Sequence, residues 1–194
     1  LFQIMVEPGF KPTITLRDKS VPSFCLFFLV RGIIATRGET MNGKKYLIFT
    51  YGCQMNARDS ETIAGILNSL GYSATEREEE ADLILFNTCS VRENPERKIY
   101  GKVTELRMLK EEKPELLIGI CGCMPQQEIE QERIREKHPE VDLVFGTHNI
   151  SRLPQLLEQA QDGRILEVWT EGRTEESLPA QREDDLKAFV NIMY

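Results

Sequence analysis

Three cysteines, Cys53, Cys89 and Cys123, occupy equivalent places in the sequence. Each stands just after a short apolar run, and a pattern typical of a helix follows each one. The spacing from one to the next is about the length of one strand-helix unit, roughly 30 residues or more. Because the cysteine thiolate is a metal ligand, three thiols in this repeated arrangement are candidates for binding a metal.

The apolar runs predict the strands of one sheet. The expected strands are residues 45–50, 82–87, 116–121, 141–145 and 164–169, with a short one near 72–74. Helical patterns separate the runs, which predicts a doubly wound, flavodoxin-like α/β fold with a mostly parallel sheet and helices on both faces. Since the carboxyl ends of parallel strands share one edge, we expect the three cysteines to meet there.

The helix expected after Cys53 has an apolar stripe at helical spacing between Ile63 and Leu70. This stripe predicts that one side of the helix packs on the sheet. Asn56 or Asp59 is expected to cap its first turn, because a short polar side chain there can accept a backbone N–H. A later helix is expected over residues 126–137.

The chain divides into four segments by composition. Residues 1–43 show no clean period and are expected to form an N-terminal extension, and residues 44–169 hold the α/β repeat. Residues 170–186 are acidic and rich in turn formers, which indicates a linker. Residues 187–194 resume an apolar strand pattern, which we interpret as the start of a truncated further domain. The sequence is therefore interpreted as a fragment.

The composition is that of an ordinary globular protein, with 41% hydrophobic and 28% charged residues. The net charge of −7 makes the chain as a whole a poor electrostatic match for a polyanion. No stretch reaches the roughly 18 consecutive apolar residues that indicate a membrane span. Five cysteines outside a short disulfide-dense scaffold favour a reducing compartment, and we expect the cytoplasm.

Three thiolates from separate loops are compatible with two kinds of metal site. A cubane iron–sulfur cluster held by three cysteines keeps one coordination position open, and open positions are typical of reactive metals. A structural zinc takes four ligands, and His148 would complete a Cys3His set with Cys53, Cys89 and Cys123. Unliganded thiols are the third alternative, and at this point all three remain open.

Two other cysteines are expected to pack as apolar side chains. Cys121 falls inside a predicted strand, and Cys25 lies among phenylalanines and a leucine. The loop that contains Cys53 lacks the Gly- or Thr-rich character of a flavin phosphate site, and no G-x-G-x-x-G or Walker pattern occurs. These observations argue against a bound flavin or nucleotide.

Three motifs around the cysteines resemble the methylthiotransferase family. They are Tyr51-Gly52-Cys53-Gln54-Met55-Asn56, Asn87-Thr88-Cys89-Ser90-Val91-Arg92-Glu93 and Gly122-Cys123-Met124-Pro125-Gln126. In this order they are similar to the N-terminal domain of the MiaB-type branch, which modifies tRNA, more than to the branch that modifies a ribosomal protein. The resemblance covers about residues 44–194.

The resemblance implies an auxiliary [4Fe-4S] cluster held by Cys53, Cys89 and Cys123. It further implies a full-length enzyme with a radical-SAM domain, a second [4Fe-4S] cluster and S-adenosyl-L-methionine. Such an enzyme adds a methylthio group to C2 of N6-isopentenyladenosine next to the tRNA anticodon (ms2i6A37). The auxiliary cluster would carry the sulfur that is inserted. No catalytic residue is expected in this chain, which should be inactive alone.

The resemblance also implies the partners. The tRNA would bind mainly through domains outside this chain, and a sulfur donor and an electron donor of unidentified kind would be needed. We expect a monomer with no membrane contact. The alternatives are a zinc-stabilised α/β binding module and a methylthiotransferase that acts on a different substrate.

Overall fold

The computed structural model describes residues 43–90, 95–169 and 179–181. The predicted N-terminal extension, apart from Gly43, and the predicted start of a further domain lie outside these residues. Of the predicted linker, only 179–181 is described. The predicted α/β domain is described throughout except for residues 91–94.

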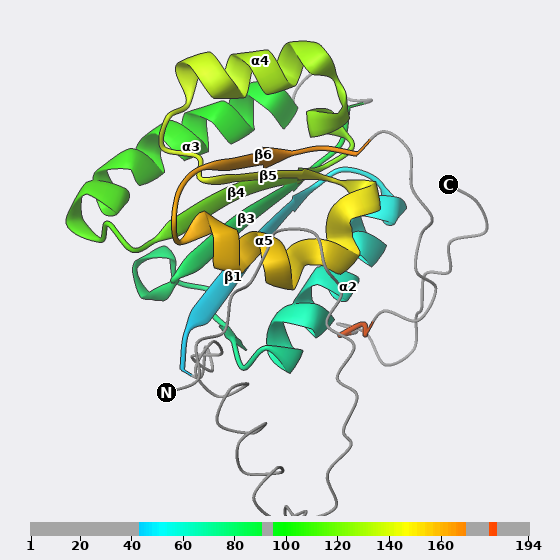
Figure 1. The fold of residues 1–194 in the computed structure, drawn as a ribbon, viewed down its shortest axis with the longest axis vertical. Helices are drawn as coiled ribbons and strands as arrows, with labels where there is room; N and C mark the ends of the chain where they lie inside the picture. Colours follow the sequence, from blue (N-terminus) through cyan, green and yellow to red (C-terminus); the bar gives the residue numbers. More distant parts are fainter. Residues whose placement is uncertain (1–42, 91–94, 170–178, 182–194) are drawn as a thin grey trace, which may run out of the picture. The chain divides into compact units, whose positions relative to one another are not determined.

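The described residues form one sheet of six parallel strands in the order β2-β1-β3-β4-β5-β6 (Figure 1). The strands are β1 (Lys45–Tyr51), β2 (Ser73–Ala74), β3 (Leu83–Thr88), β4 (Leu117–Gly122), β5 (Leu143–Gly146) and β6 (Ile165–Glu167). The prediction of a doubly wound, flavodoxin-like α/β fold is confirmed. The sheet is parallel throughout this part of the chain, where the sequence predicted a mostly parallel one.

Helices connect the strands. They are α2 (Gln54–Ser69), α3 (Pro95–Glu112), α4 (Glu128–Lys137) and α5 (Leu153–Ala160), with short 3-10 helices η1 (Glu78–Glu80), η2 (Met124–Gln126) and η3 (Thr147–Arg152). The helix predicted from Gln126 begins at Glu128 instead, because Gln127 is extended (φ −82°, ψ 123°) and separates it from η2. Among the described residues, none of the helices combines the length and the apolar character needed to cross a bilayer.

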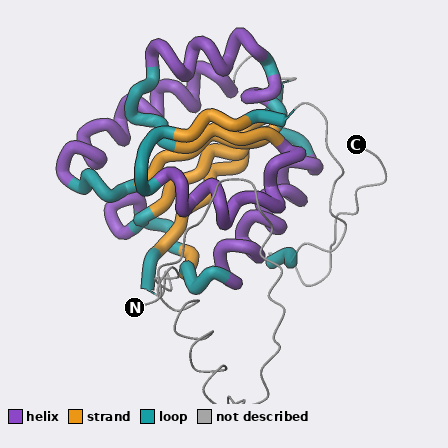
Figure 2. Tube along the Cα trace, viewed as in Figure 1, coloured by secondary structure: helices purple, strands orange, loops and turns teal. Residues whose placement is uncertain are grey.

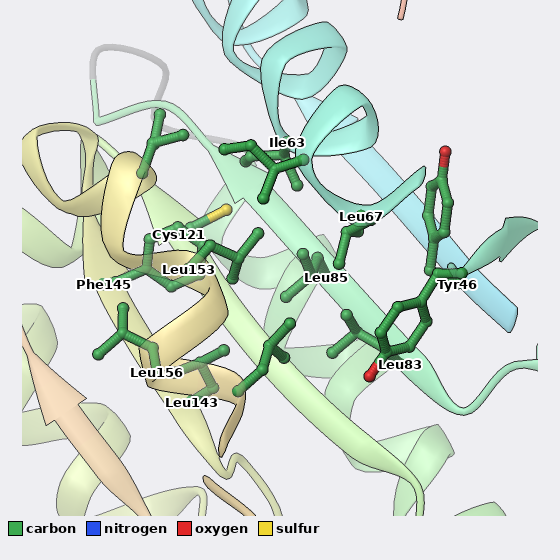
Figure 3. Packing of buried hydrophobic residues seen from close by; sticks show 14 residues of the cluster. Tyr46, Ile63, Leu67, Leu83, Leu85, Cys121, Leu143, Phe145, Leu153 and Leu156 are labelled. Atoms are coloured by element: carbon green, nitrogen blue, oxygen red, sulfur yellow. The ribbon is translucent and has the colours of Figure 1, made fainter. Parts of the chain in front are cut away.

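Helices α2 and α5 cover one face of the sheet, and Figure 3 shows their packing from close by. Ile63 and Leu67 of α2 and Leu153 and Leu156 of α5 are fully buried against residues such as Leu85 of β3. Burying one such side chain contributes about 1.5–3 kcal/mol. The apolar stripe predicted for the helix after Cys53 is therefore the side that faces the sheet.

Helices α3 and α4 cover the opposite face, so helices lie on both sides of the strands (Figure 2). Ile99 and Val103 of α3 and Ile134 of α4 pack against Ile84 and Phe86 of β3. All six residues of β3 are buried, because the strand has neighbours on both edges and helices on both faces. A central parallel strand is expected to be apolar throughout for this reason.

Four strands end in register at the carboxyl edge of the sheet. Tyr51 of β1 is opposite Thr88 of β3, Thr88 is opposite Gly122 of β4, and Gly122 is opposite Gly146 of β5. Neighbouring strands are about 4.8 Å apart. The loops that leave these four residues therefore begin side by side.

Paired charges stand at the amino edge of the sheet. Asp82 precedes β3 and accepts hydrogen bonds from Lys113 Nζ (2.8 Å) and from the backbone N–H of Lys45 (2.7 Å). Asp142 precedes β5 and pairs with Lys110. Because Lys110 and Lys113 lie at the end of α3, the two carboxylates fasten this helix to the sheet.

Candidate metal centre

The strand register brings the three cysteine loops together at the carboxyl edge. Cys53 lies two residues beyond the end of β1, and Cys89 and Cys123 lie one residue beyond the ends of β3 and β4. The backbone N–H of Cys89 donates to Tyr51 O and that of Cys123 donates to Thr88 O, both at 2.9 Å. Since the three strands are adjacent, the loops begin within about 10 Å of one another.

Exposure differs along this row of cysteines. Cys53 is exposed, Cys123 is half-buried and Cys89 is buried, with 3% of its surface exposed. The cysteine of the middle strand is thus the least accessible, and the one at the start of α2 faces solvent.

Cys53 caps helix α2, which corrects the expectation that Asn56 or Asp59 would do so. It is the N-cap residue, with an extended backbone (φ −96°, ψ −174°), and the helix starts at Gln54. Asn56 is the third helical residue, and its Oδ1 accepts the backbone N–H of Cys53 (3.2 Å) to form a capping box. Because Asn56 reaches back in this way, the helix begins at once after the cysteine, and Asp59 is buried inside it.

Hydrogen bonds at the start of α2 lower the pKa of the Cys53 thiol. The backbone N–H of Asn56 is the main cause, slight burial opposes it, and the backbone N–H of Met55 and the side chain of Cys89 add to it. The thiolate is the form that binds metals. The N-terminus of α2 therefore favours the thiolate form of Cys53, which is the form able to bind a metal.

The environment of Cys123 acts in the opposite direction. Burial, followed by the negative charges of Cys89, Asp59 and Cys53, raises the pKa of Cys123 to about 11. Two of the three charges that raise this pKa are those of the other two cysteines of the row. A bound cation would remove this mutual repulsion, since an opposite charge favours the thiolate form.

Cys121 belongs to the core, as predicted from its place in the strand. Only 1% of its surface is exposed, and Figure 3 shows it in the cluster that also contains Ile63 and Phe145. Burial raises the pKa of Cys121 well above its ordinary value. Cys25, also predicted to be a buried apolar thiol, lies outside the described residues.

A polar network next to the cysteines, buried except for Thr50, was not predicted. Asn56 Nδ2 donates to Asn87 Oδ1 (2.9 Å), Asn87 Nδ2 donates to Ser60 Oγ (2.9 Å), and the hydroxyls of Ser60 and Thr50 share a hydrogen bond of 2.7 Å. The sequence did contain a sign of this network in the positions of its two asparagines. Asparagine is disfavoured inside helices and strands, yet both residues stand there and each is within three positions of a cysteine.

Three thiols on adjacent loops are the kind of donor set that a cubane iron–sulfur cluster takes. Within the described parts of the chain, no three His, Cys, Asp or Glu side chains form a group able to hold one metal ion. His148 lies in η3, which begins directly after the end of β5 at the same edge of the sheet, and a Cys3His zinc set stays an alternative. In a cubane each thiolate binds a different iron, so its ligands stay apart, as thiols on three neighbouring loops do.

Comparison with known proteins identifies the family. The model of the family described as "Uncharacterized protein family UPF0004" matches residues 45–146, which is more than half of the chain and includes all three cysteine loops. The chain therefore belongs to this family.

The relatives confirm the resemblance seen in the three motifs. A protein of Oceanobacillus iheyensis is 54% identical over 156 residues, 79% of this chain and 30% of the relative. One of Desulforamulus reducens is also 54% identical over 156 residues, 79% of this chain and 34% of the relative. Both are named tRNA-2-methylthio-N(6)-dimethylallyladenosine synthase. The chain spans about a third of the length of these curated relatives.

Proposed function

We propose that this chain supplies the auxiliary-cluster domain of a tRNA methylthiotransferase, with Cys53, Cys89 and Cys123 as ligands of a [4Fe-4S] cluster. The observation that supports this most is the register of β1, β3 and β4, whose ends deliver one cysteine each to the same edge. The names of the relatives support the class of enzyme.

The three cysteines would have different tasks. Cys53 stands at the N-terminus of α2, where backbone N–H groups favour a negatively charged ligand. Cys89 is buried and would form the sheltered side of the site, while the exposed Cys53 would form its open side. The cluster, when bound, would carry at its open iron the sulfur destined for C2 of N6-isopentenyladenosine.

The remaining chemistry would require residues other than these three. The chain contains no C-x3-C-x2-C pattern, so we expect the second [4Fe-4S] cluster and S-adenosyl-L-methionine to be bound elsewhere in the full-length enzyme. The 194-residue chain alone should accordingly have no methylthiotransferase activity. We expect tRNA to bind mainly to other domains of the full-length enzyme. We also expect the protein to be cytoplasmic and monomeric.

Anaerobic reconstitution with iron and sulfide tests the proposal. The chain should take up about four irons and four acid-labile sulfides, and replacing Cys53, Cys89 or Cys123 with alanine should each abolish stable binding. Cys121→Ala is the matched control, because it removes a thiol two residues from Cys123 that belongs to the core, and iron uptake should persist. Colourless protein that holds one zinc tightly would instead support the zinc-stabilised binding module.

A further inference from the structure

Two fully buried asparagines connect helix α2 to strand β3 beside the cysteine loops. Asn56 Nδ2 donates to Asn87 Oδ1 (2.9 Å), and Asn87 Nδ2 donates in return to the backbone carbonyl of Asn56 (2.8 Å). A buried amide that loses its partner is costly to the folded state, because water cannot replace the hydrogen bond. The reciprocal pair therefore fixes the first turn of α2 relative to the end of β3.

Asn56 also holds Cys53. Its Oδ1 accepts the backbone N–H of Cys53 at 3.2 Å and the thiol S–H at 3.4 Å. Because a backbone N–H can only donate, Oδ1 must face Cys53, and this orientation leaves Nδ2 facing Asn87. The backbone of Cys53 is consequently linked through Asn56 to strand β3, and this link remains when the thiol loses its proton to bind a metal.

Glycines beside the cysteines leave room for the two amides. A Cβ on Gly52 would lie 2.3 Å from Asn56 Oδ1 and 2.8 Å from the Cβ of Cys89, and a Cβ on Gly122 would lie 2.6 Å from Asn87 Oδ1. All three separations are shorter than real Cβ contacts. Gly52 immediately precedes Cys53, Gly122 immediately precedes Cys123, and Asn87 itself stands two residues before Cys89, so the amide pair lies beside all three loops.

We propose that Asn56 and Asn87 are positioning residues that hold the three cysteine loops in the arrangement an iron–sulfur cluster requires. The inference depends on the proposed function, since it concerns the same site. An amide pair suits this task because each of its side-chain nitrogens and oxygens has a hydrogen-bond partner and neither residue is charged. A carboxylate in the same place would repel three thiolates.

The test uses the full 194-residue chain with Asn56→Ala, Asn87→Ala and the double substitution. The first measurement is the rate at which iodoacetamide alkylates each cysteine in metal-free protein, mapped by mass spectrometry. The second is iron and acid-labile sulfide per chain after anaerobic reconstitution at limiting iron. Each single substitution should change the Cys53 alkylation rate and lower iron retention about three- to tenfold, the factor that one lost hydrogen bond produces.

The double substitution distinguishes a pair from two separate contributions. If the two amides act together, the double variant should retain about as much iron as the worse single variant. Losses that multiply would mean that the residues act independently and would overturn the inference.

Controls separate positioning from loss of stability. Asn68→Ala removes an amide from the same helix, where it bonds Tyr46 and Gln181, and should leave both measurements unchanged. Ile63→Val weakens the core. When its melting temperature matches that of the asparagine variants, it should still bind as much iron as the unsubstituted chain. If Asn56→Ala does not fold, Asn56→Ser replaces it in both measurements, because serine keeps a polar group in the capping box.

The outcomes for the two proposals are distinct. If the unsubstituted chain takes up no iron and sulfide, the proposed function fails, whereas the alkylation rates still decide whether the amides position the thiols. If the unsubstituted chain loads and the asparagine variants match it in both measurements, the inference is wrong and the proposed function stands. Equal losses in Ile63→Val would likewise overturn the inference.

Discussion

At the amino edge of the sheet, carboxylates stand before two strands and pair with lysines, whereas at the carboxyl edge thiols and uncharged amides stand at the ends of three strands. Asp82 and Asp142 form the first arrangement with Lys113 and Lys110. The second consists of the cysteine loops and the Asn56–Asn87 pair. The first edge pairs its carboxylates with lysines, while at the second edge hydrogen bonds at the start of α2 lower the pKa of the Cys53 thiol.

This difference appears in the pKa values of two aspartates, the half-buried Asp82 at the amino edge and the buried Asp59 beside the carboxyl edge. Burial acts to raise the pKa of Asp82, but hydrogen bonds from Lys113 and from the backbone of Lys45 outweigh it and lower that pKa. Burial raises the pKa of Asp59, beside the cysteine edge, to about 7, and Arg58 opposes it only in part. The amino edge thus stabilises the charge of Asp82, whereas burial beside the cysteine edge disfavours the charge of Asp59.

The largest effect expected is that of Gly122→Ala, with Gly43→Ala as its matched control. Both glycines have φ +96°, but Gly43 at the amino edge has open space where a Cβ would lie, while a Cβ on Gly122 would lie 2.4 Å from Thr88 O. The backbone conformation costs about 1–2 kcal/mol in both variants, and the collision adds roughly 1–3 kcal/mol to Gly122→Ala alone. Urea unfolding measures the difference. Equal losses would show that the carboxyl edge is no more tightly packed than the amino edge.

Asp59→Asn should remove a pH dependence that belongs to the cysteine edge. A carboxyl whose folded-state pKa rises from 3.8 to about 7 contributes stability that is fully present below pH 3.8 and is lost as the pH rises through 7. The full shift corresponds to at most about 4 kcal/mol, and we expect roughly 2 kcal/mol. The amide introduced by the substitution cannot ionise, so the variant should match the unsubstituted chain near pH 3.5 and exceed it at pH 8.5, with the difference growing as the pH rises from 3.8 to 7. An unchanged slope between these pH values would contradict the pKa assigned to Asp59.

The sequence predicted the sheet and the meeting of the cysteine loops because both follow from alternation of strands and helices. Runs such as 82–87 are apolar enough to identify a central strand, and parallel order brings Cys53, Cys89 and Cys123 to one edge. It did not predict the capping of α2 or the amide network. The cap is a local contact, in which Asn56 reaches back to Cys53, and the sequence argument assigned the capping role to Asn56 or Asp59 instead. The amide network joins residues about 30 positions apart, such as Asn56 and Asn87, and the sequence does not say which residue each amide bonds.

Asp82→Ala should cost about 1–2 kcal/mol at neutral pH and leave the cysteine edge unaffected. The substitution removes the partner of Lys113 and of the Lys45 backbone N–H. Because the pKa of Asp82 is lowered, its contribution is present above the unfolded-state pKa and is lost as the pH falls, the reverse of Asp59. Urea unfolding at pH 7 and pH 3 measures it. Reduced iron uptake in this variant would show that the two edges are coupled.

Glu80→Gln should have the smallest effect and should separate exposed from buried charge at the amino edge. Glu80 pairs with Lys45 at 2.6 Å, and the hydrogen bond from Lys45 lowers its pKa, but 43% of the lysine side chain and 35% of the glutamate side chain are exposed. An exposed pair is screened by salt, since the Debye length is about 3 Å in 1 M salt. Any difference in urea unfolding between this variant and the unsubstituted chain should therefore vanish in 1 M NaCl, while that of Asp82→Ala should largely persist. A loss as large as that of Asp82→Ala, unchanged by salt, would mean that the whole amino edge behaves as a buried charge network.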